Sequence, residues 1–539
     1  MSTLQKEKNL ESRPWAEEVA DQVLKRKQKS FVCEGMWTPS GFFHIGNARP
    51  EIFTPYAVKK AIEERKKPVQ QNFIIDDFDA VRKIPEDLNI PEKQHEKYLG
   101  FPCATAPSPI PGYTSWAEAF TSNIRKFIPQ FGVKLNITSA FETYKKGKFN
   151  DLIVFSLNHS KEIVQVWSQV SGSEKATKGF VPIQILCEKC KRIYYTNVTK
   201  WDGKKVSYEC DCGQKGTVSP LNGNAKLHWR VHWAAHWILN KVDFESAGKD
   251  HFSKGGSVDV GQALMKEVFK KKPPIQVPTE FIQIGGAKMS GSVGNVINLE
   301  QWLEVASPEL FRFLNFSYKP NSVIEFSLTD NSFILLNDRF DRCERIYYDL
   351  EEAETKSMTQ KLKRVYELSL IEKPGKRILQ VHYPFLANIA QLFDPKKQLE
   401  QALEIFIQTK HLPKGLSTKE KGILQQKLER AQNWVNNWAP ESYKISFLET
   451  MPSEVSFSPE QRKTLDEISR AILKEKTPEA IQKAIFDISR NNTIEPKQSF
   501  KAIYQIVLGK KFGPKVGNLA FAFGKEKIAK RLQEASNTH

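Results

Sequence analysis

Hydrophobic residues near the start of the chain follow first a helical period and then the pattern of a buried sheet. Trp15, Val19 and Val23 recur at four-residue spacing, which predicts an amphipathic helix closed by the basic turn KRKQK. The apolar run FVCEGMW at 31–37 ends in Thr-Pro-Ser-Gly, as a strand that enters a loop does. A second amphipathic segment runs to about Arg65, and the apolar run QNFII follows it. This order within about 45 residues predicts a βαβ unit with a parallel sheet.

The pattern changes along the rest of the chain. Residues 101–109 are rich in Pro, Ala and Ser, which indicates an irregular excursion. Strand-like runs resume at 242–248 and 281–286, and each of them ends in glycine. From about Pro308 the pattern is helical almost without interruption. We therefore expect an α/β catalytic half followed by a largely helical half.

Length and composition narrow the class of protein. A chain of 539 residues suggests three or four domains, at roughly 100 to 200 residues per domain. Hydrophobic residues at 40% and charged residues at 26% are ordinary globular values, which exclude a mainly disordered or collagen-like chain. The 80 Lys and Arg residues outnumber the 62 Asp and Glu residues by 18. This excess favours a polyanionic partner, and general solubility is the alternative explanation.

Two further features of the sequence bear on the cellular location of the protein. No stretch approaches about 18 apolar residues, and the opening MSTLQKEKNLESRPW lacks the apolar core of a signal peptide. The seven cysteines form no secreted disulfide framework, because their number is odd and four of them cluster between Cys187 and Cys212. The scattered Cys33, Cys103 and Cys343 fit small buried hydrophobes. The expected location is the cytoplasm, without a membrane.

The first candidate site is the segment TPSGFFHIGN at 38–47, between a predicted strand and the start of a predicted helix. Phosphates bind readily at helix N-termini, where N–H groups are unpaired and the dipole is positive. His44 and Asn47 add side-chain donors, and Gly46 lacks a Cβ, which would let a base or sugar approach the backbone. Taken alone, this segment also fits a structural turn.

The second candidate site is the segment GGAKMSGS at 285–292, a glycine-rich loop with one lysine and two hydroxyls. A flexible cationic loop can neutralise charge that develops on transferring phosphate oxygens. Met289 would anchor this loop in an apolar pocket.

These two segments, in this order and about 240 residues apart, resemble the HIGH and KMSKS signatures of class I aminoacyl-tRNA synthetases. The variant PSGxxHIGN, followed by KMSxSxGN, is similar to the archaeal-type class I lysyl-tRNA synthetases. Four further segments agree with that family: IDDFDAVRKIP at 75–85, WRVHWAAHW at 229–237, SAGKDHFSKGGS at 246–257 and LGKKFGPKVG at 508–517. The resemblance thus spans nearly the whole chain.

The resemblance implies a Rossmann-type catalytic domain with a zinc-ribbon-like insertion, followed by an all-α anticodon-binding domain. The expected divisions are the first catalytic half at 1–150, the insertion at 151–222, the second catalytic half at 223–307, a helical connecting region at 308–375 and the anticodon-binding domain at 376–539.

The resemblance also implies a two-step reaction that needs no protein nucleophile. The carboxylate of lysine attacks the α-phosphate of ATP, and a terminal ribose hydroxyl of tRNA then takes the lysyl group. The protein positions the reactants and stabilises charge, with Mg²⁺ on the phosphates. The implied catalytic set is His44, Asn47, Lys288, Ser290 and Ser292. The implied ATP-binding set is Ser40, Gly41, His44, Gly46, Asn47, Asp250, Lys288 and Gly291, with Asp250 at the ribose hydroxyls.

A lysine pocket must pair the substrate ammonium with an anion. The nearest acidic cluster is Asp76, Asp77 and Asp79, directly after a predicted buried strand, and capping of the following helix is the alternative role. Trp229, Trp233 and His251 would wall the alkyl chain or contact the ammonium, and core packing is the alternative. The expected lysine-binding set is Gly35, Asp76, Asp77, Trp233 and His251.

Departures from the family pattern at four positions bear on activity. Gly291 stands where KMSKS has its second lysine, and Val293 replaces the basic residue that usually follows. His232 and His236 stand where the family usually has Asp and Arg, which removes an acidic candidate from the lysine pocket. Amino-acid specificity or catalytic strength could therefore differ from those of the family.

Four cysteines form two close pairs, Cys187-x2-Cys190 and Cys210-x-Cys212. A structural zinc ion explains this spacing better than unligated thiols, because so small a segment has too little core to fold alone. Three histidines, His228, His232 and His236, also recur at four-residue spacing. Interleaved tryptophans favour packing or RNA contact for these histidines over a second metal site.

The C-terminal run at 497–531 contains nine Lys or Arg residues and one acidic residue, Glu526, a net charge of +8. Basic and aromatic side chains together can bind single-stranded bases and phosphates, and a solvated basic face is the alternative. The aromatic residues of this run are Tyr504, Phe512, Phe521 and Phe523.

The sequence as a whole thus predicts a lysine-activating synthetase with tRNA(Lys), lysine and ATP as partners, and a monomer is favoured. One alternative is a glutamyl-tRNA synthetase, whose pocket would need basic residues. Another is a non-catalytic paralogue that binds tRNA, which Gly291 and His232 keep open.

Overall fold

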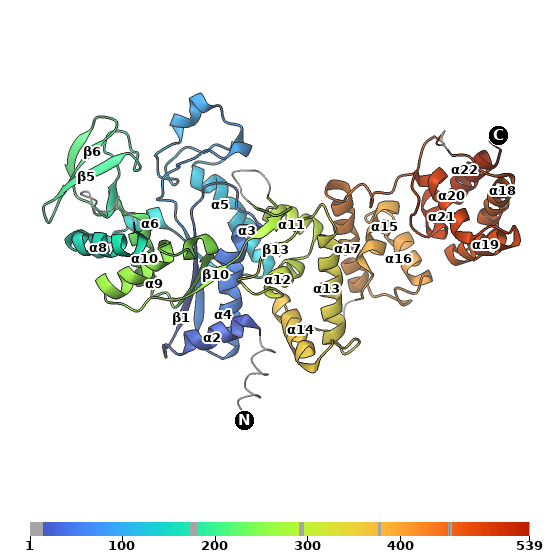
Figure 1. The fold of residues 1–539 in the computed structure, drawn as a ribbon, viewed down its shortest axis with the longest axis horizontal. Helices are drawn as coiled ribbons and strands as arrows, with labels where there is room; N and C mark the ends of the chain where they lie inside the picture. Colours follow the sequence, from blue (N-terminus) through green and yellow to red (C-terminus); the bar gives the residue numbers. More distant parts are fainter. Residues whose placement is uncertain are drawn as a thin grey trace. The chain divides into compact units, whose positions relative to one another are not determined.

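The structure is a computed structural model that describes residues 14–172, 181–289, 296–375, 379–450, 452 and 455–537. These residues form two compact units (Figure 1). The first unit contains the chain up to 303 together with 307–326 and 349–373, and the second contains 304–306, 327–348 and the chain from 374 onward. The five divisions expected from the sequence are finer and stay predictions. No helix in the described part is long and apolar enough to cross a membrane.

A five-stranded parallel sheet with the order β10-β9-β1-β2-β3 forms the centre of the first unit. Its strands are β1 (Phe31–Trp37), β2 (Val69–Ile75), β3 (Asn136–Ser139), β9 (Phe244–Gly248) and β10 (Ile275–Thr279). Phe31 lies opposite Val69 and Trp37 lies opposite Ile75, which confirms the predicted βαβ unit. β1 has β2 on one side and β9 on the other, so the winding of the chain reverses there. Ligands of such sheets bind at the carboxyl ends of the strands beside this reversal.

The connection from β1 to β2 is the predicted amphipathic segment. It consists of α3 (Ile45–Ala48), a π-helical turn (Arg49–Phe53) and α4 (Thr54–Glu64). The π-helical turn contains Pro50, which lacks the N–H that a regular α-helix needs at this place. The other helices of this unit are α2 (Trp15–Leu24), α5 (Trp116–Phe127), α6 (Ala140–Lys145), α7 (Asn150–Asn158), α8 (Ser160–Ser171), α9 (Trp229–Asn240), α10 (Ser257–Ala263), α12 (Pro308–Phe316) and α14 (Lys356–Ser369). The helix α11 (Leu299–Val305) crosses the boundary between the two units.

The cysteine-bearing insertion extends from the first unit on a pair of antiparallel strands. β4 (Ile183–Ile185) leads out and pairs with β8 (Ala225–Leu227), which leads back. Between them, β5 (Thr196–Trp201), β6 (Val206–Cys210) and β7 (Lys215–Val218) form an antiparallel sheet. The cysteine-bearing part of the expected insertion is thus a small β structure, whereas residues 150–171 form α7 and α8.

A second small sheet holds the lysine of the glycine-rich loop. β11 (Ile282–Ile284) turns into β12 (Ala287–Lys288), and β13 (Ile324–Glu325) pairs with β11 in parallel. This short β13 interrupts the helical pattern that the sequence predicts from Pro308 onward.

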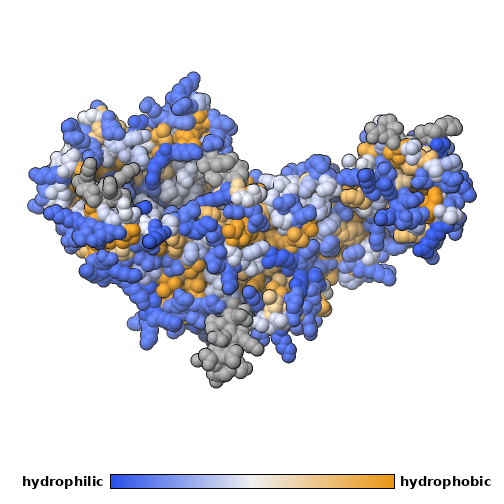
Figure 2. Space-filling view, viewed as in Figure 1, coloured by the Kyte–Doolittle hydropathy of each residue, from blue (hydrophilic) through white to orange (hydrophobic). Residues whose placement is uncertain are grey.

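The second unit is helical in its described part. Its helices are α13 (Ser332–Tyr347), α15 (Tyr383–Leu392), α16 (Leu399–Gln408), α17 (Thr418–Asn437), α18 (Pro459–Lys474), α19 (Pro478–Asn491), α20 (Pro496–Leu508), α21 (Val516–Phe523) and α22 (Lys525–Asn537). Sequence explains where several of them begin: Ser417 and Ser458 form capping boxes, and proline occupies the first turn of α18, α19 and α20. On the face drawn in Figure 2, hydrophilic residues cover most of the surface and apolar residues occur in scattered patches.

Candidate active site

A cavity of about 350 Å³ lies at the carboxyl ends of β1 and β9, where the parallel sheet predicts a ligand. Residues from both signature segments line it, together with residues that follow β1 and β9. The predicted residues among them are Ser40, His44, Gly46, Asn47, Asp250, His251 and Lys288. Segments more than 200 residues apart in the sequence therefore meet at one site.

The imidazole of His44 caps α3 and is held in one tautomer. Its Nδ1 accepts the N–H of Gly46 at 3.1 Å, and Oδ1 of Asn47 accepts the N–H of His44 at 3.3 Å. Burial, and secondarily Lys288, lower the pKa of His44 to about 3, so the ring is neutral at pH 7. Because Nδ1 is an acceptor, the ring proton lies on Nε2, which remains as a donor for a ligand oxygen.

Position 46 requires glycine for a second cause besides the approach of a ligand. A Cβ at this position would lie 2.9 Å from the His44 ring, inside any ordinary contact distance. The hydrogen bond that caps α3 and the close approach of a ligand to the backbone thus both depend on Gly46.

Lys288 and Asp250 form an ion pair at the mouth of the cavity. Nζ of Lys288 lies 2.7 Å from the Asp250 carboxylate and 3.8 Å from the centre of the Phe281 ring. Both side chains are about half exposed, so the pair is weak and each partner can turn to a ligand. Met289 is 1% exposed, which confirms its predicted role as anchor. The predicted Ser290, Gly291 and Ser292 lie outside the described residues.

Asp76 and Asp77 have partners within the chain and do not line the cavity. The ammonium of Lys226 lies 2.8 Å from Asp76 and 2.5 Å from Asp79, and all three side chains are buried. Asp77 accepts the Ser139 hydroxyl at 2.6 Å and the N–H of Phe141 in the first turn of α6 at 2.8 Å. Asp77 thus supports the N-terminus of α6, a distant helix whose own N-cap residue is Ser139, and an internal lysine pairs with Asp76.

The remaining predicted lysine-binding residues have mixed placements. His251 lines the cavity beside Trp229, whereas the indole of Trp233 lies behind them and donates to Glu245 at 2.8 Å. Gly35 does not line the cavity either, and neither does the predicted ATP-binding Gly41. A Cβ on Gly35 would lie 1.9 Å from the carbonyl oxygen of Glu51, so this glycine lets β1 approach the π-helical turn.

Glu51 is the acidic residue of the cavity that sequence reasoning missed. Its Oε2 accepts the N–H of Met36 at 3.2 Å, and no lysine or arginine pairs with it in the described part of the chain. Burial, together with the nearby Glu245, raises the pKa of Glu51 well above its ordinary value. The sequence contains a signal that could have found Glu51. It follows His44 by seven residues, about two turns of an α-helix, so a helical pattern places both residues on the same side of that helix.

The other charged side chains among the described residues that line the cavity form pairs of opposite charge. Arg82 pairs with Asp79 at 3.3 Å, and Lys288 pairs with Asp250. His232 and His236 on α9 are buried, and burial with the nearby Lys226 lowers their pKa values, so both are neutral. In the family pattern these two positions hold an aspartate and an arginine, so the two neutral histidines remove one negative and one positive charge. Glu51 is therefore the lining carboxyl group that has no paired cation among the described residues.

The histidines of α9 serve packing and hydrogen bonding. Nδ1 of His232 lies 2.9 Å from the Tyr144 hydroxyl, His236 lies 3.2 Å from Glu34, and His228 packs against Trp167. Among the described residues, the group that could hold a metal ion contains the four cysteines and no histidine.

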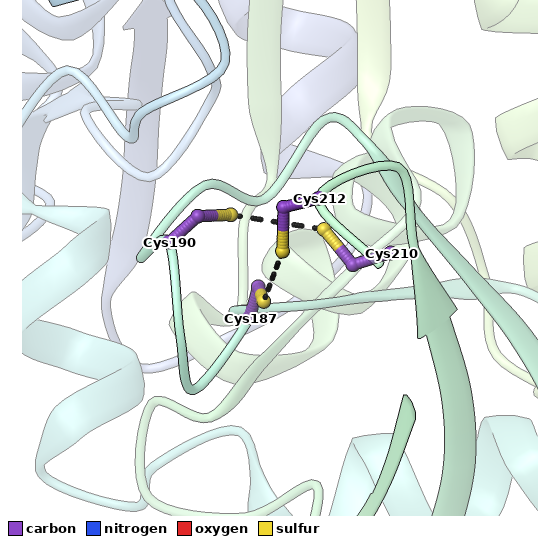
Figure 3. A group of neighbouring side chains, drawn as sticks. All are labelled: Cys187, Cys190, Cys210 and Cys212. Carbon is purple, nitrogen blue, oxygen red and sulfur yellow. Dashed lines mark hydrogen bonds between the residues drawn. The ribbon is translucent and has the colours of Figure 1, made fainter. Parts of the chain in front are cut away.

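The four cysteine sulfurs form a compact cluster in the insertion (Figure 3). All four lie within 4.8 Å of one another, and the pairs Cys187–Cys212 and Cys190–Cys210 are each 3.7 Å apart. A disulfide would require about 2.05 Å, so these thiols are not bonded to each other. Four thiolates bound tetrahedrally to zinc at about 2.3 Å are separated by about 3.8 Å. The cluster therefore fits a structural zinc ion.

The aromatic residues of the basic C-terminal run differ in exposure. Phe512 is 70% exposed, whereas Tyr504 is buried and donates its hydroxyl to the Pro514 carbonyl at 2.8 Å. Phe521 and Phe523 are partly buried against the core of α18–α22. Among these four residues, Phe512 is the one placed to stack on an external ring.

Comparison with known proteins covers both halves of the chain. The family described as "tRNA synthetases class I (K)" matches residues 13–372, and "Anticodon binding domain" matches 439–536. Proteins named "Lysine--tRNA ligase" from Pyrococcus horikoshii and Borrelia garinii are each 32% identical over 96% of this chain, and over 99% and 98% of theirs. The protein of that name from Thermococcus kodakarensis is 34% identical over 96% of this chain and 99% of its own. A solved glutamate tRNA ligase from Elizabethkingia meningosepticum aligns at 13% identity with a TM-score of 0.43, over 95% of this chain and 100% of that one.

The two family models and the three named relatives cover both compact units of the chain. The chain belongs to the class I tRNA synthetases of the K type.

Proposed function

We propose that this chain is a lysine–tRNA ligase that activates lysine with ATP and transfers it to the 3′ end of tRNA(Lys). The observation that carries the proposal is the charge of the cavity. Every other acidic group there is paired with a cation, and Glu51 alone among the described lining residues presents a carboxyl group without one. A substrate with a terminal ammonium supplies the missing positive charge. The relatives named "Lysine--tRNA ligase" support the same substrate.

In the first step the chain positions ATP and stabilises charge. Class I synthetases use ATP with Mg²⁺, which neutralises charge on the phosphates. His44 donates from Nε2 to a phosphate oxygen, and Asn47 fixes the cap that aims this ring. Lys288 leaves Asp250 for the departing pyrophosphate, which frees the Asp250 carboxylate for two ribose hydroxyls.

Lysine lies with its ammonium at Glu51 in this proposal. The backbone contact of Gly35 fixes the turn that carries Glu51, so Gly35 supports the pocket without touching substrate. Trp229 and His251 wall the alkyl chain. Glu51 takes the role that the sequence assigned to Asp76 and Asp77, because those two carboxylates are occupied within the chain.

The insertion and the second unit serve the tRNA in this proposal. A zinc ion held by Cys187, Cys190, Cys210 and Cys212 would cross-link the ends of the small β structure and supply no chemistry. The helical region that matches an anticodon-binding domain would contact the anticodon, with Phe512 as its exposed ring.

Amino-acid-dependent exchange of pyrophosphate into ATP, measured with tRNA present, tests the assignment. We expect exchange with lysine and none with glutamate. Exchange with glutamate would overturn the specificity, and exchange with no amino acid would indicate a tRNA-binding paralogue without catalysis.

A further inference from the structure

A buried arginine, Arg49, stands in the sequence between two parts of the active site. It begins the π-helical turn after α3, so it follows Asn47 of the His44 cap by two residues and precedes Glu51 by two. Its side chain is 1% exposed, and it does not line the cavity that its neighbours line. Any contribution of Arg49 to the site therefore passes through the groups that it holds.

The guanidinium of Arg49 joins two segments that are far apart in the sequence. Nη1 donates to the Glu280 carbonyl at 2.9 Å and to the Phe281 carbonyl at 3.4 Å. Nη2 donates to the Lys319 carbonyl at 3.0 Å and to the Ser322 carbonyl at 2.9 Å. Burial lowers the pKa of Arg49 to about 10, so the group stays charged at pH 7 and these hydrogen bonds are charge-assisted. One planar group thus fixes both segments to the π-helical turn.

Both segments lead into the small sheet that carries Lys288. The first continues as β11, which pairs with β12 so that Gln283 lies opposite Lys288. The second precedes β13, which pairs with β11 in parallel. The centre of the Phe281 ring lies 3.8 Å from Nζ of Lys288. Arg49 therefore holds the base of the sheet from which Lys288 reaches the cavity.

The chain after the glycine-rich loop is attached to α3 as well. The N–H of Ile45 donates to the Ile297 carbonyl at 3.0 Å, and His44 pairs with Asn298 in an isolated β-bridge. The segment that carries the His44 cap therefore holds the chain both before and after Lys288.

We propose that Arg49 is a positioning residue, which sets the place of Lys288 relative to His44 so that both side chains reach the phosphates of one ATP. This inference rests on the proposed function and adds the group that aligns its two donors. Donors stabilise developing charge only when they are placed in advance, and a displacement of about 1 Å can cost about 100-fold in rate. Lysine at position 49 would keep the charge, but a compact ammonium cannot span both sets of carbonyls as the planar guanidinium does.

The test is a double-mutant cycle on lysine-dependent pyrophosphate exchange by the full-length chain with tRNA present. Lys288→Ala removes the cation, and we expect kcat to fall about 100-fold. Arg49→Lys keeps Lys288 but loosens the sheet that carries it, so kcat falls about 10- to 100-fold while the KM for lysine stays within about twofold. In the Lys288→Ala background, Arg49→Lys lowers kcat less than about threefold, because the group that it positions is gone.

A purely structural role for Arg49 gives a different result. Loss of folded chain lowers activity by the same factor with or without Lys288, so the two substitutions would then be additive. Urea unfolding checks that each variant is folded in the assay. Arg49→Gln is the second variant, because a neutral amide avoids an uncompensated buried ammonium, and it should show the same coupling to Lys288.

Arg312→Lys is the matched control. Arg312 is also buried, and it donates to the Phe131 carbonyl at 3.0 Å and to the Leu368 carbonyl at 2.8 Å. Neither carbonyl belongs to β11, β12 or β13. Any loss of kcat in this variant should therefore be the same with and without Lys288.

Equal losses of kcat from Arg49→Lys in the two backgrounds would overturn the inference, as would a raised KM for lysine with an unchanged kcat. Coupling to Lys288 together with exchange for an amino acid other than lysine would keep the role of Arg49 and overturn the proposed substrate. Absence of exchange by the unaltered chain with any amino acid would overturn both.

Discussion

Among the described residues, no lysine or arginine pairs with the cavity-lining carboxyl group of Glu51, and this predicts a pH-dependent affinity for lysine. Burial, together with the nearby Glu245, raises the pKa of Glu51, so this carboxyl group ionises at a higher pH than a free glutamate does. An ammonium pairs only with the ionised form, so the KM for lysine falls as pH rises through the raised pKa of Glu51. Glu51→Gln keeps an acceptor for the Met36 N–H but removes the charge, and we expect the KM for lysine to rise about 10- to 100-fold.

The measurement is lysine-dependent pyrophosphate exchange as a function of pH, with the KM for ATP recorded in parallel. Glu63→Gln is the matched control, because Glu63 forms a surface pair with Lys59 on α4. The amide that Glu51→Gln introduces cannot ionise, so the pH dependence of the lysine KM should vanish only in the Glu51 variant. The same dependence in both variants would contradict the assignment.

Lys226 is a buried cation between two buried carboxylates, and its removal is predicted to destabilise the first unit. Lys226→Met leaves Asp76 and Asp79 without their ammonium, at a cost of about 3–5 kcal/mol in the free energy of unfolding. The triple variant with Asp76→Asn and Asp79→Asn should recover part of this loss, because the uncompensated charges are gone. Urea unfolding followed by tryptophan fluorescence measures both, and an unchanged midpoint for Lys226→Met would contradict the prediction.

The insertion of β5, β6 and β7 depends on its cysteine cluster, which predicts a metal-dependent local fold. We expect about one zinc ion per chain and its loss in Cys210→Ser, with reduced protection of the β5–β7 amides from hydrogen exchange. Cys103→Ala is the control, because this buried cysteine lies outside the cluster. Full metal content in the Cys210 variant would contradict a four-cysteine site.

Periodicity and motif spacing predict the elements that position the site. They do not predict which buried groups form pairs when the two partners are far apart in the sequence. The β1–α3–β2 unit, the insertion and the anchoring of Met289 follow from local patterns in the sequence. The partner of Asp76 does not, because Lys226 follows it by 150 residues and lies on a strand of the insertion. Any acidic residue after a buried strand could face the substrate, and only the fold shows which one is already neutralised. Sequence reasoning therefore assigned the ammonium to carboxylates that the chain itself occupies, and Glu51 replaces them in the proposal.

The two compact units interleave along the chain, whereas the five divisions expected from the sequence are consecutive segments. The helix α13 belongs to the second unit, although the chain returns to the first unit at 349–373 before the second unit resumes. Within the second unit, Phe333 of α13 packs against Trp434, with ring centres 5.5 Å apart, and Trp434 donates to the Leu328 carbonyl at 2.8 Å. Residues 307–326 and 349–373 lie in the first unit and 327–348 in the second, and the expected division at 308–375 stays a prediction.

This interleaving predicts that the two obvious C-terminal truncations behave differently. A chain that ends at residue 438 loses the anticodon-binding match, whose helices α18–α22 enclose a core of their own, and it keeps Trp434 against α13. A chain that ends at residue 373 leaves the apolar face of α13, including Phe333 and Leu336, without cover. We expect the longer chain to be monodisperse with native near-ultraviolet circular dichroism and a reduced kcat/KM for tRNA. The shorter chain should aggregate or bind a hydrophobic dye, and equal behaviour of the two chains in gel filtration would show that α13 does not depend on the helices that follow it.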